Sequence, residues 1–92
     1  LTDSVNVIQS YAADNTQPAP SATDYAMVGV TGVDANSLSE VNGQVDSQSL
    51  TTVAAIQTLT NSVNVIRTYA LDNTQPAPSV SDYAMVGVTG VD

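Results

Sequence analysis

The chain has 92 residues and a net charge of −8, and its 42% hydrophobic content includes only four aromatic side chains, all Tyr. Because one cation, Arg67, stands against eight Asp and one Glu, binding to nucleic acid or to an anionic membrane surface is disfavoured, since both need clustered Lys and Arg. His, Cys, Lys and Trp are absent, which excludes a Ser-His-Asp triad, a His or Cys metal site and a Lys Schiff base. No apolar run approaches the roughly 20 residues that cross a bilayer, so no membrane insertion is predicted.

The chain repeats itself with an offset of 58 residues. Residues 1–34 align with residues 59–92, and only six of these 34 positions differ. The six exchanges all keep polarity or small apolar character: Asp3/Asn61, Gln9/Arg67, Ser10/Thr68, Ala13/Leu71, Ala22/Val80 and Thr23/Ser81. Such near-identity indicates tandem duplication. We therefore predict a complete repeat unit over residues 1–58 and a partial second unit over residues 59–92.

The first predicted element is a helix. Its apolar residues step by 4, 3 and 4 positions, which is the periodicity of one helical face, at Leu1, Val5, Ile8 and Ala12. A proline follows at position 18, and at position 76 in the second copy. The helix is therefore expected to end at Asn15, and its second copy at Asn73.

A corner follows the first helix. "QPAP" must be extended, because proline fixes φ and keeps its predecessor out of the helical region. "SATD" fits a capping box with Ser21 as N-cap and Asp24 at N3, which predicts a short helix that Gly29 ends. Gly32 then redirects the chain. The second copy has the same positions at Ser79, Asp82, Gly87 and Gly90. A strand is the alternative for "YAMVGVTGV", which is rich in β-branched residues, but a lone strand has no partner within its own unit.

A second amphipathic helix is predicted for "DANSLSEVNGQV". Leu38, Val41 and Val45 share one face of it, and Asp34 is the N-cap candidate because its carboxylate can accept the free N–H groups of the first turn. Gly43 lies within this helix and weakens it by about 1 kcal/mol relative to Ala.

The last predicted helix is long and passes from one copy into the next. Apolar residues recur every three or four positions from Leu50 to Ala70, which predicts one helix from about residue 50 to residue 71, roughly 33 Å long. Ser47 or Ser49 is its expected N-cap. The predicted fold is therefore all-α, with small three-helix units joined by a long shared helix into a rod-like tandem array.

The corner and the helix after it resemble a helical tandem repeat of very large bacterial surface and adhesin-like proteins. The pattern is roughly Pro-Thr-x-x-Asp-Tyr, a run of small residues, Gly-Val-Thr-Gly-Val, and a capped helix. The matching residues are Pro20, Asp24, Tyr25, Gly29, Val30, Thr31, Gly32, Val33, Asn36, Leu38, Val41 and Asn42, then Pro78, Asp82, Tyr83, Gly87, Val88, Thr89, Gly90 and Val91. Met27 and Val28 depart from it, because the family prefers alanines there. The resemblance implies a repeated extracellular module on the bacterial cell surface and carries over no catalytic residue.

Calcium is the one cofactor for which the sequence offers candidate ligands. Hard oxygens occur in two loops, at Asp14 and Asn15 and again at Asp34 and Asn36. Neither loop has the central Gly and distal bidentate Glu of an EF-hand, so helix capping is the favoured role of these carboxylates. The paired tyrosines could form a glycan platform, but Tyr at helical spacing is more often part of a core.

These observations predict a non-catalytic spacer or stalk repeat of a large extracellular bacterial surface protein. The alternative is an adhesive module that recognises a glycan, another cell surface or its own copies. The expected partners are neighbouring repeats. Because the second unit is incomplete, Leu59, Val63, Ile66 and Tyr83 should either pack back on the first unit or leave an apolar patch, and such a patch would favour self-association.

Overall fold

The fold was described from a computed structural model, which covers residues 2–88 and Gly90. These residues form five helices and no strand: α1 (Thr2–Ala13), α2 (Ala22–Met27), α3 (Leu38–Gln48), α4 (Val53–Leu71) and α5 (Val80–Met85). The predicted all-α class is confirmed for this part of the chain. Leu1 of the predicted helix face, and Thr89 and Val91 of the second corner, lie outside the described residues.

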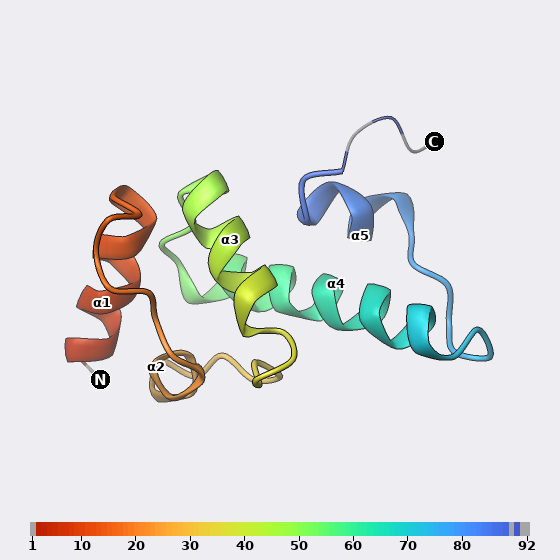
Figure 1. The fold of residues 1–92 in the computed structure, drawn as a ribbon, viewed down its shortest axis with the longest axis horizontal. Helices are drawn as coiled ribbons and strands as arrows, with labels where there is room; N and C mark the ends of the chain where they lie inside the picture. Colours follow the sequence, from red (N-terminus) through yellow and green to blue (C-terminus); the bar gives the residue numbers. More distant parts are fainter. Residues whose placement is uncertain (1, 89, 91–92) are drawn as a thin grey trace.

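Contacts between helices connect α1 to α5 step by step along the chain. α1 packs against α2 and α3, α3 packs against α4, and α4 packs against α5. Figure 1 shows α4 running from the group formed by α1, α2 and α3 toward α5 at the other side of the molecule. The molecule measures 39 × 24 × 20 Å along its principal axes.

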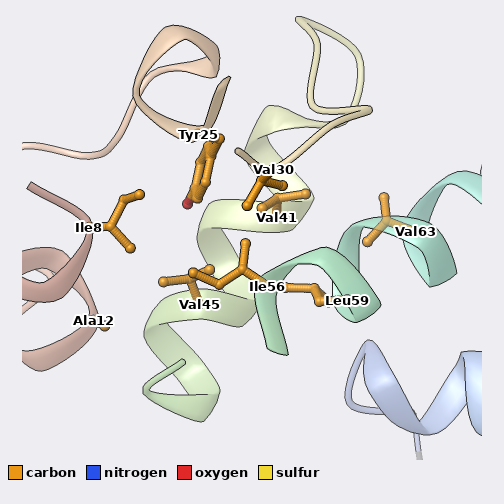
Figure 2. Packing of buried hydrophobic residues seen from close by; sticks show 9 residues of the cluster. All are labelled: Ile8, Ala12, Tyr25, Val30, Val41, Val45, Ile56, Leu59 and Val63. Atoms are coloured by element: carbon orange, nitrogen blue, oxygen red, sulfur yellow. The ribbon is translucent and has the colours of Figure 1, made fainter. Parts of the chain in front are cut away.

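The hydrophobic core lies between α1, α2, α3, the corner after α2 and α4 (Figure 2). Its nine buried residues are Ile8, Ala12, Tyr25, Val30, Val41, Val45, Ile56, Leu59 and Val63. No residue of α5 is buried. The two copies of the repeat therefore have nearly the same sequence but different degrees of burial.

Both short helices have the capping box that was expected. The Oγ of Ser21 accepts from the Asp24 N–H at 3.1 Å, and the Asp24 carboxylate accepts from the Ser21 N–H at 2.9 Å. Ser79 and Asp82 form the same two bonds at 3.1 and 2.9 Å. The alternative strand for this segment is therefore wrong.

A glycine closes each short helix. Gly29 has φ of +94°, its N–H donates to the Ala26 carbonyl at 3.1 Å, and the Val30 N–H donates to the Tyr25 carbonyl at 3.0 Å. This pair of bonds is the Schellman motif, which needs a left-handed residue at the position that Gly29 occupies. The second copy repeats it, with φ of +84° at Gly87.

α1 ends at Ala13, two residues before the expected Asn15, whereas α4 ends at Leu71, where the long helix was predicted to end and two residues before Asn73. The Asp14 carboxylate accepts from the N–H and the hydroxyl of Thr16 at 3.0 and 2.7 Å. The same two bonds, of 2.9 and 2.7 Å, form at Asp72. An Asp side chain that binds the backbone two residues ahead offers the chain a turn in place of another helical residue.

α4 begins at Val53 rather than near Leu50, and neither Ser47 nor Ser49 caps it. Ser47 lies inside α3, while Ser49 has φ of 55° and ends that helix. The N-cap of α4 is Thr52, whose hydroxyl accepts from the Ala55 N–H at 3.2 Å. The sequence allowed a helix from residue 50, but the left-handed turn at Ser49 separates the two helices.

Asp34 forms a turn before α3 rather than capping the helix itself. Its carboxylate accepts from the N–H groups of Asn36 and Ser37 at 2.9 and 3.1 Å. The helix begins four residues after Asp34, at Leu38, and Ser37 occupies the N-cap position without a side-chain capping bond. The predicted bonds from free N–H groups to the Asp34 carboxylate therefore form, but one turn before the N-cap position.

Candidate interaction surface

The carboxylates of the described residues do not form a metal centre. No group of three or more His, Cys, Asp or Glu in the described part of the chain could hold a metal ion. Among the calcium candidates, Asp14 and Asp34 form the turns described above, and the Asn15 amide donates to the Asp46 carboxylate at 3.2 Å. Asn36 lies at the edge of a groove described below. Calcium coordination needs six to eight oxygens around one point, and these side chains point to separate backbone and side-chain partners.

The carboxylates that form caps and turns have lowered pKa values. The backbone N–H of Thr16 lowers the pKa of Asp14, that of Asn36 lowers the pKa of Asp34, and that of Ser21 lowers the pKa of Asp24. A general acid or base at neutral pH needs a carboxyl pKa raised toward 7. These carboxylates are therefore suited to capping and not to proton transfer.

Tyr25 is held inside the core by a pair of hydrogen bonds. Its ring is fully buried, and its hydroxyl donates to the Asn42 Oδ1 at 2.5 Å. The Asn42 amide in turn donates to the Pro20 carbonyl at 2.9 Å. Burial raises the pKa of the Tyr25 phenol. This tyrosine is a core residue, as the sequence favoured, and its ring is not available to stack on a ligand.

A hydrogen bond between helices recurs in both copies. The Ser4 hydroxyl donates to the Asp24 carboxylate at 2.9 Å, and the Ser62 hydroxyl donates to the Asp82 carboxylate at 2.8 Å. Each bond joins a long helix to the short helix that follows it, and both serines are buried. The sequence analysis did not identify these serines as functional. The signal was present, because both copies place a Ser on the apolar face of the long helix.

Two amide side chains of α4 bind the first corner. Gln57 accepts from the Thr31 N–H at 2.8 Å and donates to the Thr31 carbonyl at 2.9 Å. Asn64, seven residues further along, donates to the Gly32 carbonyl at 3.1 Å. Gly32 has φ of +91°, and a Cβ added there would lie 2.8 Å from the Asn64 amide nitrogen, so any other residue would strain the backbone and displace the Asn64 side chain. Sequence reasoning had assigned only a turn to this position.

The second copy carries an apolar groove, which we call the open groove. It has a volume of about 400 Å³ and lies between α4, the end of α5 and the start of α3. Its walls are Asn36, Glu40, Val63, Ile66, Arg67, Ala70 and Val86.

The equivalent hollow of the first copy is nearly filled, and we call it the closed groove. Three of its wall residues, Val5, Ile8 and Val28, stand 58 positions before Val63, Ile66 and Val86 of the open groove. The other three are Thr51, Val53 and Ile56, which come from the start of α4 and the residues before it. The space left between them is about 40 Å³. The residues that follow the corner in sequence therefore close this hollow in the first copy.

Equivalent residues of the two copies differ in exposure accordingly. Val30 is 2% exposed and its counterpart Val88 is 44% exposed. The same contrast holds for Ile8 against Ile66, Ala12 against Ala70, Pro20 against Pro78, and Tyr25 against Tyr83. Both predicted outcomes for the incomplete unit occur together: Leu59 and Val63 are buried, whereas Ile66 and Tyr83 stay partly exposed.

None of the described helices is both long enough and apolar enough to span a bilayer. Comparison with known protein families, with curated proteins and with solved structures finds no match to this chain.

Proposed function

We propose that the chain is a non-catalytic spacer or stalk repeat of a large, adhesin-like bacterial surface protein. The observation that carries the proposal is that α4 contributes side chains to both units. Ile56 and Leu59 belong to the core of the first unit, whereas Ser62 binds Asp82 of the second. A continuous helix between two units passes the orientation of one unit on to the next.

Contacts on both sides of the repeat boundary support this role. Gln57 lies before the boundary and Asn64 lies after it, yet both bind the corner of the first unit. The Gln48 amide of α3 also donates to the Met85 carbonyl at the end of α5, at 2.6 Å. Bending at the boundary would break these bonds, so they favour a semi-rigid arrangement over units joined by a flexible linker.

The extracellular location rests on the resemblance of the corner to repeats of bacterial surface proteins. The composition supports it, since neutral polar residues and Asp dominate the polar positions and Cys and Lys are absent. The lowered carboxyl pKa values and the absence of His, Cys and Lys from the sequence support a role that is mechanical rather than catalytic.

The test is the growth of molecular length with the number of units. Chains with one, two and four consecutive 58-residue units would be compared by small-angle X-ray scattering. A spacer predicts a maximum dimension that grows in proportion to the number of units. A flexible string of units would grow roughly as the square root of that number, and this result would refute the proposal.

A matched pair of variants tests whether α4 is the source of the stiffness. Thr58 is exposed and lies next to the boundary. Thr58→Pro should kink the helix, because proline removes a helical hydrogen bond and costs about 3 kcal/mol. Thr58→Ala leaves the helix intact. We expect the proline variant of the four-unit chain to be shorter and more flexible than the alanine variant; equal dimensions would show that the stiffness comes from elsewhere.

A further inference from the structure

We propose that the open groove is the docking site for a second copy of the segment over residues 35–58, supplied by a following repeat unit. This inference rests on the proposed function, because it names the partner of a unit within the array. The occupant would be an α3-type helix together with the start of an α4-type helix.

The two grooves are built alike, so an occupant that fits one fits the other. Each groove is formed by a long helix and a short helix with the same capping box, the same Ser–Asp hydrogen bond and the same Schellman closure. In the first copy the segment over residues 35–58 covers these walls, and the hollow shrinks to about 40 Å³. The printed sequence contains this segment once, and the second hollow measures about 400 Å³.

The second copy also presents the polar groups that α3 binds in the first. Asn42 accepts from the Tyr25 hydroxyl and donates to the Pro20 carbonyl, while its neighbours Val41 and Val45 are fully buried. The counterparts of Tyr25 and Pro20 are Tyr83 and Pro78, and both are partly exposed. The occupant must therefore carry an amide between two valines on one helical face, which is the pattern "VNGQV" of α3.

The experiment appends the sequence of residues 35–58 after Asp92 and follows amide hydrogen exchange. The control chain carries the same residues in scrambled order. If the segment docks, exchange should slow at least about tenfold over residues 63–71 and 80–86, because burial of the groove raises the free energy of local opening. The scrambled chain should exchange at the rate of the 92-residue chain. Equal exchange in the two extended chains would overturn the proposal.

Two substitutions on α4 make the test specific to the groove. Ala70 lines the open groove and is exposed in the 92-residue chain, so Ala70→Gln should leave the helical circular dichroism of that chain unchanged. It should abolish the protection that the appended segment gives, since the counterpart Ala12 is buried in the first copy. Leu71 is 83% exposed and its counterpart Ala13 is also exposed. Leu71→Gln should therefore keep the protection, and loss of protection in both variants would overturn the site.

The occupant is tested separately from the groove. If the 92-residue chain dimerises without the appended segment, and Ala70→Gln dissociates the dimer, the groove takes another surface of the chain and the proposed occupant is wrong. If the appended segment does not dock but multi-unit chains still lengthen in proportion to unit number, this inference is wrong and the spacer function stands. If the segment docks but multi-unit chains do not lengthen in proportion to unit number, the spacer function is wrong and the docking site stands.

Discussion

Tyr25→Phe and Tyr83→Phe make the same change at equivalent positions of the two copies. Comparing their stabilities therefore separates the effect of burial from the effect of sequence. The two residues occupy equivalent positions in two short helices with the same caps. Tyr25 is fully buried and donates to Asn42, whereas Tyr83 is partly exposed. Phe keeps the ring and removes only the hydroxyl, so the difference between the two variants reports the surroundings of that hydroxyl.

The expected magnitudes differ clearly. Tyr25→Phe leaves the Asn42 Oδ1 buried without the hydrogen bond that the phenol donates, and an unsatisfied buried polar group costs about 1–3 kcal/mol. For a domain of this size each 1 kcal/mol lowers Tm by roughly 4–8 °C. Tyr83→Phe removes a partly exposed hydroxyl, and changes at such positions usually stay within about 0.5 kcal/mol.

Urea unfolding at pH 7, followed by far-ultraviolet circular dichroism, measures both variants. We expect a lower midpoint for Tyr25→Phe and an unchanged one for Tyr83→Phe. Spectrophotometric titration gives a second readout, because the raised pKa of Tyr25 should produce a late ionisation step that is missing from Tyr25→Phe. Equal destabilisation by the two variants would refute the conclusion that only the first copy is completely packed.

Gly32→Ala should destabilise the fold by more than Gly29→Ala, since both residues have positive φ but only at Gly32 would the added Cβ meet Asn64; equal urea midpoints would contradict the proposed close contact. Gly43→Ala should raise the free energy of unfolding by up to about 1 kcal/mol, because the added methyl group meets nothing within 4 Å; a loss of stability by calorimetry would contradict this. Because the pKa of Asp24 is lowered in the folded state, its carboxylate stabilises the fold at pH values above its ordinary pKa of 3.8, and this stability is lost as the pH falls through the folded-state pKa. Urea midpoints measured between pH 2 and 6 should therefore fall less steeply with decreasing pH in Asp24→Asn. An unchanged slope would rule out this capping contribution.

The helices themselves could be predicted because their signals are local. The spacing of Val5, Ile8 and Ala12 marks one helical face, and the Ser21–Asp24 capping box starts a helix whatever surrounds it. The lower burial of residues 59–88 was also predictable, since the printed sequence holds the segment over residues 35–58 once.

Helix ends and contacts between units were not predictable to the same degree. The Asp14 side chain binds the Thr16 backbone in place of a further helical residue, and Ser49 adopts a left-handed conformation that glycine usually takes. The binding of Thr31 by Gln57 spans 26 residues. No local pattern signals such a contact, because it depends on how the corner meets α4 in three dimensions.

The continuity of α4 has a consequence for how such an array could change its length in evolution. α1 and the second half of α4 end at equivalent residues, and the corners after them fold alike. Aligned residues 58 positions apart therefore belong to the same kind of helix or turn in the two copies. A deletion or duplication of 58 residues would regenerate an intact helix and an intact corner wherever the two ends join, even in the middle of α4. Recombination between copies could then lengthen or shorten the protein without creating a faulty junction.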